Sequence, residues 1–284
     1  LEQGRKKIVV SILKSTNQPT AALRFARYLG ARDRGLMQWE KYHFQPAVGD
    51  AWAETPHVVL FSGGVNRLAV EDLIQRFQER EGVEIDTVYN GCGILVGQMK
   101  LGERPDAYFS CDVSFVNQVK DIFMDPLNVS ETDMVIVVEK GNPLHIKSLQ
   151  DLTRPNLRLG VANAEQSALG ALTRRLLEQM KIYDSILENV KSQTPTADLL
   201  VNQIRTGSLD AVIVYEANTP YVRDKLEIIP IDHPAAKAIQ PYAVGKESLY
   251  PNLMSRLMDA ICSETSRSKF ESMGFRWLAG KENP

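Results

Sequence analysis

The sequence has few cysteines, no long apolar run and almost no net charge, and each absence narrows the class of protein. Cys92, Cys111 and Cys262 are an odd number, which excludes a complete disulfide framework, although two of them could still pair. No apolar run approaches the roughly 18 residues that a membrane-spanning helix needs. The formal net charge of −2 gives no electrostatic reason to expect nucleic acid as a partner.

Histidine is also scarce, because the chain has only four, at positions 43, 57, 145 and 233. They show no metal-ligand spacing, so no metal site is predicted from them. The sequence opens Leu-Glu-Gln-Gly, without an initiator Met or the apolar core of a signal peptide, as expected of a processed or cut chain. Its 284 residues, 44% hydrophobic and 24% charged, suffice for one large globular domain or two smaller ones.

Short apolar runs alternate with amphipathic segments from residue 57 onward, which is the pattern of an α/β fold. At this spacing the first strands should form a parallel sheet with right-handed crossovers. Gly82 stands where a C-cap glycine would end the first helix. The first unit is predicted to have strands at 57–63, 83–89 and 106–111, and helices at 66–81, 94–102 and 112–123.

A second alternating set follows a long β-branched run at 133–143, which we interpret as a strand leaving the first unit. The chain then returns for two final helices, at 251–264 and 268–275. Two α/β units connected in this way should enclose a ligand cleft, because ligands bind beyond the carboxyl ends of the strands. The second unit is predicted to have strands at 157–163, 188–193, 209–216 and 225–232, and helices at 168–180 and 196–207.

Two glycine-rich turns lead from strands of the first unit directly into helices: Ser-Gly-Gly-Val-Asn at 62–66 and Asn-Gly-Cys-Gly at 90–93. The first N–H groups of a helix lack partners and carry partial positive charge, so an anion can bind there. Glycine lets a ligand approach the backbone closely. Neither turn matches a P-loop or a dinucleotide fingerprint. We predict that both belong to one binding site, the alternative being tight turns without a ligand.

Five segments between about residues 56 and 280 carry a family resemblance: LFSGGVNRLAVEDLIQRFQEREGVEID, PDAYFSCD, LRLGVANAEQSALGALTRRLLEQMKIYD, LDAVIVYEAN and FESMGF. Over this range the sequence resembles the molybdate-binding proteins of ABC importers, a family of type II periplasmic solute-binding proteins. The resemblance implies a two-lobed α/β fold, with 56–133 and 232–280 in lobe 1 and 134–231 in lobe 2. It also implies an extracytoplasmic, for example periplasmic, location, an ABC permease as partner, no catalysis, no cofactor and no membrane insertion.

The resemblance further implies that hydroxyls and backbone N–H groups hold a small oxyanion such as molybdate or tungstate. The two hydroxyl positions of lobe 1 fall on Val65 and Cys92, so the expected serines are missing, although the backbone donors remain. Residues 63–66 and 90–94 should face 167–170 and 196–197 across one cleft. The predicted ligand-binding residues are Ser62, Gly63, Gly64, Val65, Asn66, Gly91, Cys92, Gly93, Ser167, Leu169, Ala197 and Tyr215, with Ser62, Asn66 or Ser167 as candidates to replace the lost hydroxyls.

Three other functions remain open from the sequence. A metal ion or another small solute could be held by Cys92, Tyr215 and Glu216. A thiol enzyme with Cys92 as nucleophile would need a general base, and no histidine stands in a recognisable relation to it. A ligand-sensing regulatory domain would need a DNA-binding part, for which no helix-turn-helix signal is present.

Some of the candidate residues have structural interpretations as well. Asp112 and Asn163 are expected first as N-cap or turn residues. Cys111 and Cys262 are expected in the core. A disulfide between Cys92 and Cys111 is possible if their two turns meet, which sequence spacing does not decide.

Residues 9–44 resemble the C-terminal residues 242–275 of the same chain. Lys14 aligns with Lys246 and Pro19 with Pro251, and Phe44 aligns with Phe275 after a single-residue shift. We interpret residues 1–55 as a remnant of a preceding repeat followed by a linker. A strand near 8–13 and helices near 20–29 and 34–42 are predicted, packed on the same chain because of their apolar content and remote from the cleft.

Overall fold

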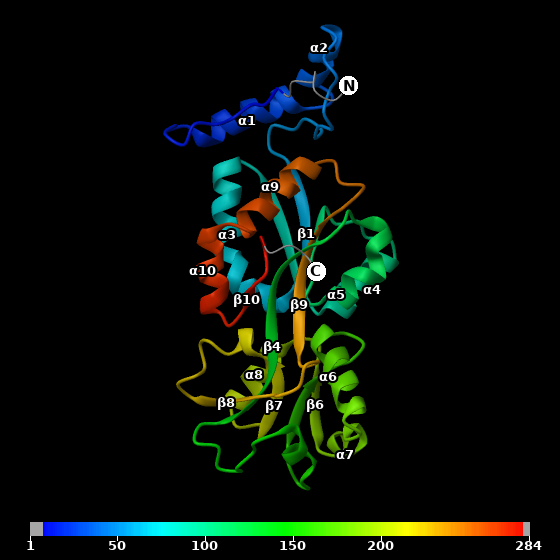
Figure 1. Ribbon diagram of the computed structural model, residues 1–284, viewed down its shortest axis with the longest axis vertical. Coiled ribbons are helices and arrows are strands. Elements are labelled where there is room, and N and C mark those ends of the chain that lie inside the picture. The colour runs from blue at the N-terminus through cyan, green and yellow to red at the C-terminus, as the bar shows by residue number, and fades with distance from the viewer. Residues whose placement is uncertain (1–7, 281–284) are drawn as a thin grey trace.

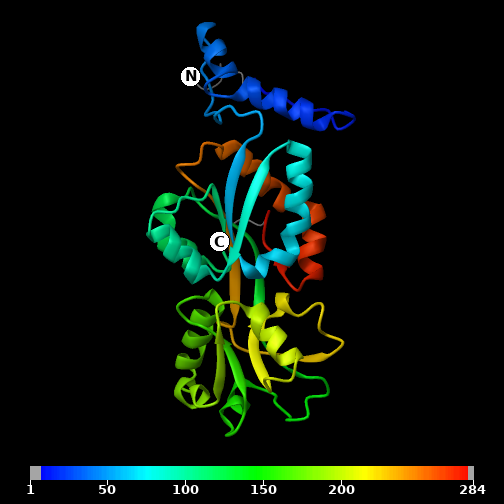
Figure 2. The same ribbon diagram turned by 180° about the vertical axis from the view of Figure 1, so that it is seen from behind.

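The computed structural model describes residues 8–280, which form three bodies arranged along the longest axis of the molecule (Figure 1). A pair of helices, α1 (Pro19–Gly30) and α2 (Gly35–Lys41), lies at one end. Two mixed α/β bodies follow, which we call lobe 1 and lobe 2, and the view from behind shows the same order (Figure 2). No helix among the described residues is long and apolar enough to cross a membrane.

Lobe 1 is built on the parallel sheet that the sequence predicts. Strand β1 (His57–Gly63) pairs in parallel with β2 (Glu84–Asn90) on one side and with β3 (Ala107–Phe109) on the other. Gly82 ends the first helix of lobe 1, α3, with a left-handed φ of 64°, as its C-cap position requires. The helices of lobe 1 are α3 (Arg67–Glu81), α4 (Cys92–Lys100), α5 (Val113–Val116), α9 (Pro251–Ile261) and α10 (Glu264–Ser272), with the 3-10 turns η2 (Gly64–Asn66) and η3 (Asn117–Ile122).

Lobe 2 repeats this construction with its own buried strands. Strand β5 (Leu159–Ala162) pairs in parallel with β6 (Val190–Thr194) and with β7 (Ala211–Tyr215). All five residues of β7, the run Ala-Val-Ile-Val-Tyr, are buried, as expected of a central strand covered on both faces. The other elements are α6 (Ala168–Gln179), α7 (Tyr183–Leu187), α8 (Ala197–Arg205), β8 (Leu226–Pro230), η4 (Leu149–Thr153) and η5 (Glu216–Asn218).

Two antiparallel strands, β4 (Leu127–Glu139) and β9 (Lys237–Val244), run between the lobes. The first part of β4 pairs with β9, and from Met134 onward it pairs with β7 and β8 of lobe 2. The predicted strand at 133–143 is therefore longer at its start and shorter at its end. The sheet order is β2-β1-β3-β9-β4-β7-β5-β6, with β8 and the short β10 (Arg276–Trp277) also paired to β4.

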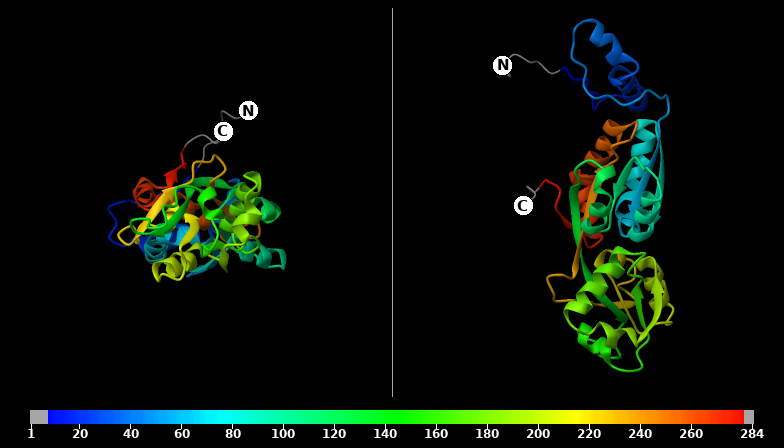
Figure 3. Two further views of the ribbon diagram at one scale, coloured as in Figure 1. Left: turned by 90° about the horizontal axis from the view of Figure 1, so that it is seen from below. Right: turned by 90° about the vertical axis from the view of Figure 1, so that its right-hand side faces the viewer.

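The N-terminal segment differs from its prediction in one element. The two predicted helices are confirmed as α1 and α2, but the strand near 8–13 is wrong, because these residues have no regular structure. A strand needs a neighbour for its backbone groups, and no strand among the described residues pairs with this segment. Helix α1 packs on α3 of the same chain, and α2 projects beyond it (Figure 3).

Candidate functional site

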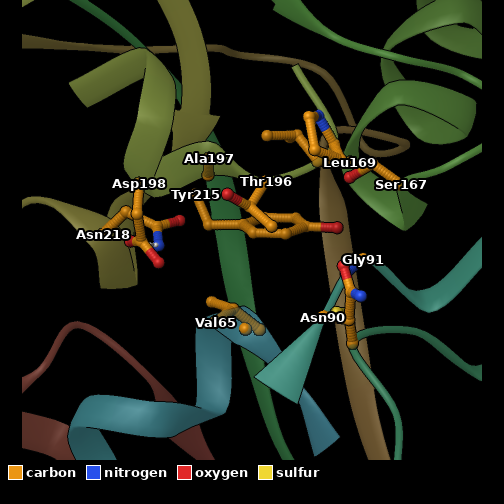
Figure 4. A pocket seen from close by; sticks show the side chains of 13 residues that line it. Val65, Asn90, Gly91, Ser167, Leu169, Thr196, Ala197, Asp198, Tyr215 and Asn218 are labelled. Carbon is orange, nitrogen blue, oxygen red and sulfur yellow. Dashed lines mark hydrogen bonds between the residues drawn. The ribbon is translucent and has the colours of Figure 1, made fainter. Parts of the chain in front are cut away.

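A small pocket with a cavity volume of about 20 Å³ lies between the two lobes, where strands of both end and helices begin (Figure 4). Residues of lobe 1 form one side of it and residues of lobe 2 form the other side. This volume is far below the roughly 300–1,000 Å³ of pockets for drug-sized ligands, so the pocket suits only a ligand of a few atoms. The lining residues are Gly64, Val65, Asn90, Gly91, Cys111, Ser167, Leu169, Pro195, Thr196, Ala197, Asp198, Tyr215 and Asn218.

Two helix N-termini of lobe 2 open onto the pocket. Helix α6 begins after Ser167 and α8 begins after Thr196, and neither cap side chain is hydrogen bonded to its helix backbone. The first N–H groups of both helices and the two hydroxyls therefore remain available as donors. The partial positive charge at each helix start favours an anion between them.

Tyr215 supplies the most deeply buried polar group of the pocket. It is the last residue of β7 and only 2% exposed, and its hydroxyl has no hydrogen-bond partner among the described residues. Burial holds its pKa well above the ordinary value, so the phenol stays protonated and can donate a hydrogen bond. Figure 4 shows the ring crossing the pocket with its oxygen directed toward Gly91 and Ser167.

Asp198 and Asn218 bring acceptor groups to the pocket. The amide Nδ2 of Asn218 donates to Oδ1 of Asp198 over 3.0 Å, and Oδ1 of Asn218 is left buried without a partner. Oδ2 of Asp198 lies 4.0 Å from the position that a Cβ on Gly64 would occupy. The residue is exposed as a whole, yet the protein crowds its carboxylate, and the lost hydration raises its pKa. A fully ionised anion in the pocket would meet this negative charge.

The glycine turn between β2 and α4 also connects the two lobes. The N–H groups of Gly93 and Ile94 donate to the carbonyl oxygen of Gln166 in lobe 2, over 3.0 and 3.4 Å. A Cβ on Gly93 would stand 1.9 Å from the oxygen of Glu165, and one on Gly91 would stand 2.3 Å from that of Gln166. These glycines let the two lobes meet, and the start of α4 binds a protein carbonyl.

The structure brings seven of the twelve predicted residues together around the pocket: Gly64, Val65, Gly91, Ser167, Leu169, Ala197 and Tyr215. The side chains of Ser62 and Asn66 are buried behind it, where Asn66 donates to the carbonyls of Phe109 and Ser110. Neither therefore offers the pocket a replacement hydroxyl or amide. Gly63 and Gly93 also lie outside the lining.

Cys92 does not reach the pocket, because Cys111 stands in front of it. Cys92 is fully buried, and its sulfur lies 2.7 Å from that of Cys111, with both thiols free. Cys111, expected only as a core residue, is buried and also lines the pocket. The hydrogen bond to Cys92 and burial hold the pKa of the Cys111 thiol well above its ordinary value, so it faces the pocket uncharged.

Asp198, Asn218 and Pro195 are lining residues that the sequence reasoning missed. The signal for Asp198 was its place in the first turn of a predicted helix whose start faces the cleft. Asn218 carried no comparable signal, because it follows Tyr215 in an irregular 3-10 turn. Asp112 caps α5 as expected, and Asn163 accepts backbone N–H groups in a turn.

The residues suggested for a metal site or for a thiol enzyme do not lie together in the structure. Glu216 pairs with Arg223 over 2.8 Å and does not line the pocket, so it does not join Cys92 and Tyr215 in a metal site. No group of three or more His, Cys, Asp or Glu in residues 8–280 could hold a metal ion. None of the four histidines lines the pocket beside a thiol.

Comparison with known proteins connects this geometry to a family. The molybdate-binding protein ModA of Mycobacterium tuberculosis is 27% identical over 224 residues, which cover 77% of this chain and 84% of that protein. The sulfate-binding protein SubI of Mycobacterium tuberculosis superposes with a TM-score of 0.69 at 16% identity, covering 79% of this chain and 88% of that one. The periplasmic molybdate-binding protein of Azotobacter vinelandii superposes with a TM-score of 0.67 at 12% identity, covering 78% and 99%.

The two superposed structures share the two-lobed fold of type II periplasmic binding proteins, which confirms the predicted fold class. Because these structures are only 16% and 12% identical to this chain, their superposition establishes a shared fold and nothing about function. The bacterial extracellular solute-binding protein family matches residues 58–276, which is most of the chain. The protein therefore belongs to the bacterial extracellular solute-binding protein family.

Proposed function

We propose that this protein captures a small oxyanion, such as molybdate or tungstate, outside the cytoplasm and delivers it to the permease of an ABC importer. The relatives named for molybdate and sulfate support an oxyanion as the ligand class. No chemical step is proposed, because binding and release alone serve transport.

The observation that carries this proposal is the set of donors in the pocket. The buried, unpartnered hydroxyl of Tyr215 and the free starts of α6 and α8 all offer N–H or O–H groups. No Lys, Arg or His is among the described lining residues, so neutral donors and helix dipoles would hold the anion. An oxyanion supplies hydrogen-bond acceptors for these unpaired donors.

Closure of the lobes is the proposed capture step. The predicted division assigns 56–133 and 232–280 to lobe 1 and 134–231 to lobe 2. The chain therefore passes from lobe 1 to lobe 2 within β4. At that point the partner of β4 changes from β9 to β7, between Asp133 and Met134. Two strands crossing between compact bodies can act as a hinge, a motion typical of periplasmic binding proteins. The contact of Gly93 and Ile94 with Gln166 would hold the closed form.

Thermal unfolding with added oxyanions tests this function. Molybdate or tungstate should stabilise the protein by about 2.7 kcal/mol at a concentration 100 times Kd, because the ligand binds only the folded chain. Calorimetric titration should give one site per chain. Sodium chloride at equal ionic strength controls for general salt effects. Stabilisation by a divalent or ferric ion, with none by molybdate, tungstate or sulfate, would refute the oxyanion assignment.

A further inference from the structure

We propose that the N-terminal segment 13–44 is the closing helical pair of a second solute-binding domain, and that its exposed apolar face docks on the first lobe of that domain. The proposal is independent of the ligand. It rests on a point-by-point structural match between this segment and residues 245–275 of the same chain, and on the opposite burial of the two segments.

The match begins in the turn before each first helix. The N–H of Gln18 donates to the hydroxyl of Thr16 over 3.1 Å, and the N–H of Tyr250 donates to that of Ser248 over 3.0 Å. Gln18 has φ −128° and ψ 56°, and Tyr250 has φ −128° and ψ 49°. Each is followed by a proline that opens the helix, so two segments far apart in sequence enter their helices in the same way.

The match continues after the second helix of each pair. His43 and Gly274 both adopt left-handed backbone, with φ of 64° and 83°. Such a φ is uncommon for a residue other than glycine, which makes its recurrence at the aligned position informative. The residue after each is a phenylalanine, and its N–H donates to the carbonyl of the residue five positions earlier, which lies in the second helix of the pair. The two bonds are Phe44 to Trp39 over 3.3 Å and Phe275 to Phe270 over 3.1 Å.

The same aligned positions carry an aromatic pair in each segment, with interplanar angles of 90° and 58°. The rings of Trp39 and Phe44 have centroids 5.2 Å apart, and those of Phe270 and Phe275 are also 5.2 Å apart. In the C-terminal segment this pair is buried, with Phe270 fully covered and in contact with Trp277 of β10. In the N-terminal segment Trp39 is 36% exposed and Phe44 is 44% exposed. The local structure is repeated, but the surface that should cover it is not among the described residues.

Helix α1 shows the same difference on one of its faces. The core positions Leu257 and Ile261 of α9 are fully buried. Their counterparts in α1 are not, because Phe25 is 63% exposed and Leu29 is only half-buried. A large apolar side chain gains about 1.5–3 kcal/mol on full burial, so this face favours a partner. The partner that fits is a surface like the one α9 and α10 cover here, because the positions match one by one.

The opposite face of α1 is already occupied by this domain. Leu23 is buried there, and the hydroxyl of Thr20 donates to the carbonyl of Glu79 in α3 over 3.1 Å. The nearly buried carboxylate of Glu81 lies 3.4 Å from the guanidinium of Arg27 and 3.1 Å from that of Arg256 in α9. One face of α1 thus contacts this domain, and the opposite face would contact the second domain. Helix α1 would therefore join the two domains rigidly.

The linker after α2 strengthens this attachment. Both carboxylate oxygens of Asp50 accept backbone N–H groups at the start of α9, from Asn252 over 2.8 Å and from Leu253 over 3.0 Å. Asp50 is itself almost fully buried. A capping carboxylate from the linker fixes the N-terminal segment against lobe 1, so a domain carried on α1 and α2 would keep a defined orientation.

The first experiment compares matched variants of this chain. Leu257→Asp should abolish cooperative folding or lower Tm by more than about 10 °C, because it buries an unpaired charge. Phe25→Asp, at the aligned position, should leave Tm unchanged because its side chain faces water. An equal loss of Tm in both variants would contradict the exposed apolar face.

The second experiment examines the polypeptide expressed from the natural start of its coding region, including whatever is encoded before Leu1. A solute-binding domain should precede Leu1, and backbone amides of residues 20–44 should exchange hydrogen at least about 100-fold more slowly than in the 284-residue chain. In that longer protein Phe25→Asp should remove the protection. The proposal is overturned if no such domain is encoded, if exchange is the same in both proteins, or if the 284-residue chain forms a dimer that Phe25→Asp dissociates.

Discussion

The two sides of the cleft contribute different things to the pocket, although both are built from strands that run into helices. On the lobe 1 side, the side chain of Cys92 is withdrawn into the core and the start of α4 is bound to Gln166. On the lobe 2 side, Ser167 and Tyr215 keep donors directed toward the pocket without protein partners. On the proposed function, lobe 2 would therefore hold most of the recognition chemistry, and lobe 1 would provide the surface on which the cleft closes.

The largest effect is expected from Gly93→Ala, which tests the closing role of lobe 1. The new Cβ would stand 1.9 Å from the backbone oxygen of Glu165, so the lobes must separate. Overpacking costs about 1–3 kcal/mol, and the lost hydrogen bonds to Gln166 add about 0.5–1.5 kcal/mol each. Affinity for the oxyanion should fall by about a hundred- to thousandfold in calorimetric titrations.

Gly97→Ala is the matched control for this variant, because Gly97 lies on the same helix and a Cβ there meets nothing within 4 Å. It should leave affinity unchanged and raise the free energy of unfolding by about 0.5–1 kcal/mol. Small-angle scattering should report a more open Gly93→Ala protein. Unchanged affinity in Gly93→Ala would contradict the assignment of closure to lobe 1 and of ligand recognition to lobe 2.

The second prediction tests recognition by lobe 2. Tyr215→Phe removes a hydroxyl that has no protein partner, so the unliganded protein should keep its stability. Hydrogen bonds to charged groups contribute about 1.5–3 kcal/mol, so affinity should fall by about ten- to hundredfold. Tyr242→Phe is the control, because the hydroxyl of Tyr242 donates to Met254 over 3.2 Å inside lobe 1. That variant should lose about 1 kcal/mol of stability and no affinity.

The third prediction concerns the acceptor side of lobe 2. Ionised Asp198 repels a fully ionised oxyanion, and two unit charges 4 Å apart interact by about 1 kcal/mol even in water. Asp198→Asn should therefore raise affinity at neutral pH by about fivefold to tenfold. Glu216→Gln, in the same lobe outside the pocket, should have no effect on affinity.

The pH dependence follows from the same charge. Burial raises the pKa of Asp198, with its hydrogen bond to Asn218 and the positive charge of Arg67 acting in the opposite direction. As pH falls through this pKa, Asp198 takes up a proton and the repulsion disappears. Affinity for an oxyanion whose own charge stays constant, such as sulfate, should rise on acidification in the natural protein. It should stay flat in Asp198→Asn, and a parallel rise in both proteins would assign the effect to another group.

Much of the fold could be predicted from sequence because its signals are local. The strand at 57–63 and the glycine stop at Gly82 match the structure, since alternating apolar runs and C-cap glycines act within a few residues. The strand near 8–13 failed because strand formation depends on a partner, which a local pattern does not contain. The same pattern in β9 does form a strand, because β3 and β4 lie beside it.

The pocket was harder to predict because its details depend on contacts between the lobes. The turn at 90–93 lies between the lobes, and its glycines approach carbonyl groups more than seventy positions away. Cys92 follows a strand end as a ligand-facing residue would, yet its thiol lies 2.7 Å from that of Cys111. Asp198 faces the pocket only because α8 starts opposite Gly64. Such relations are set by tertiary packing.

The smallest effect is expected from restoring serine to the two positions of lobe 1 where the resemblance implies a hydroxyl. Val65 lines the pocket, whereas Cys92 lies behind Cys111. Val65→Ser should therefore strengthen oxyanion binding by about threefold to tenfold, the contribution of one hydrogen bond of about 0.5–1.5 kcal/mol, at some cost in stability from lost apolar burial. Cys92→Ser should leave affinity within about twofold, since its side chain does not reach the pocket. Calorimetric titration of both variants, with Cys262→Ser as a cysteine control outside the pocket, separates the two positions. A gain in affinity from Cys92→Ser, without one from Val65→Ser, would mean that the bound state turns the α4 start toward the ligand and that lobe 1 also recognises it.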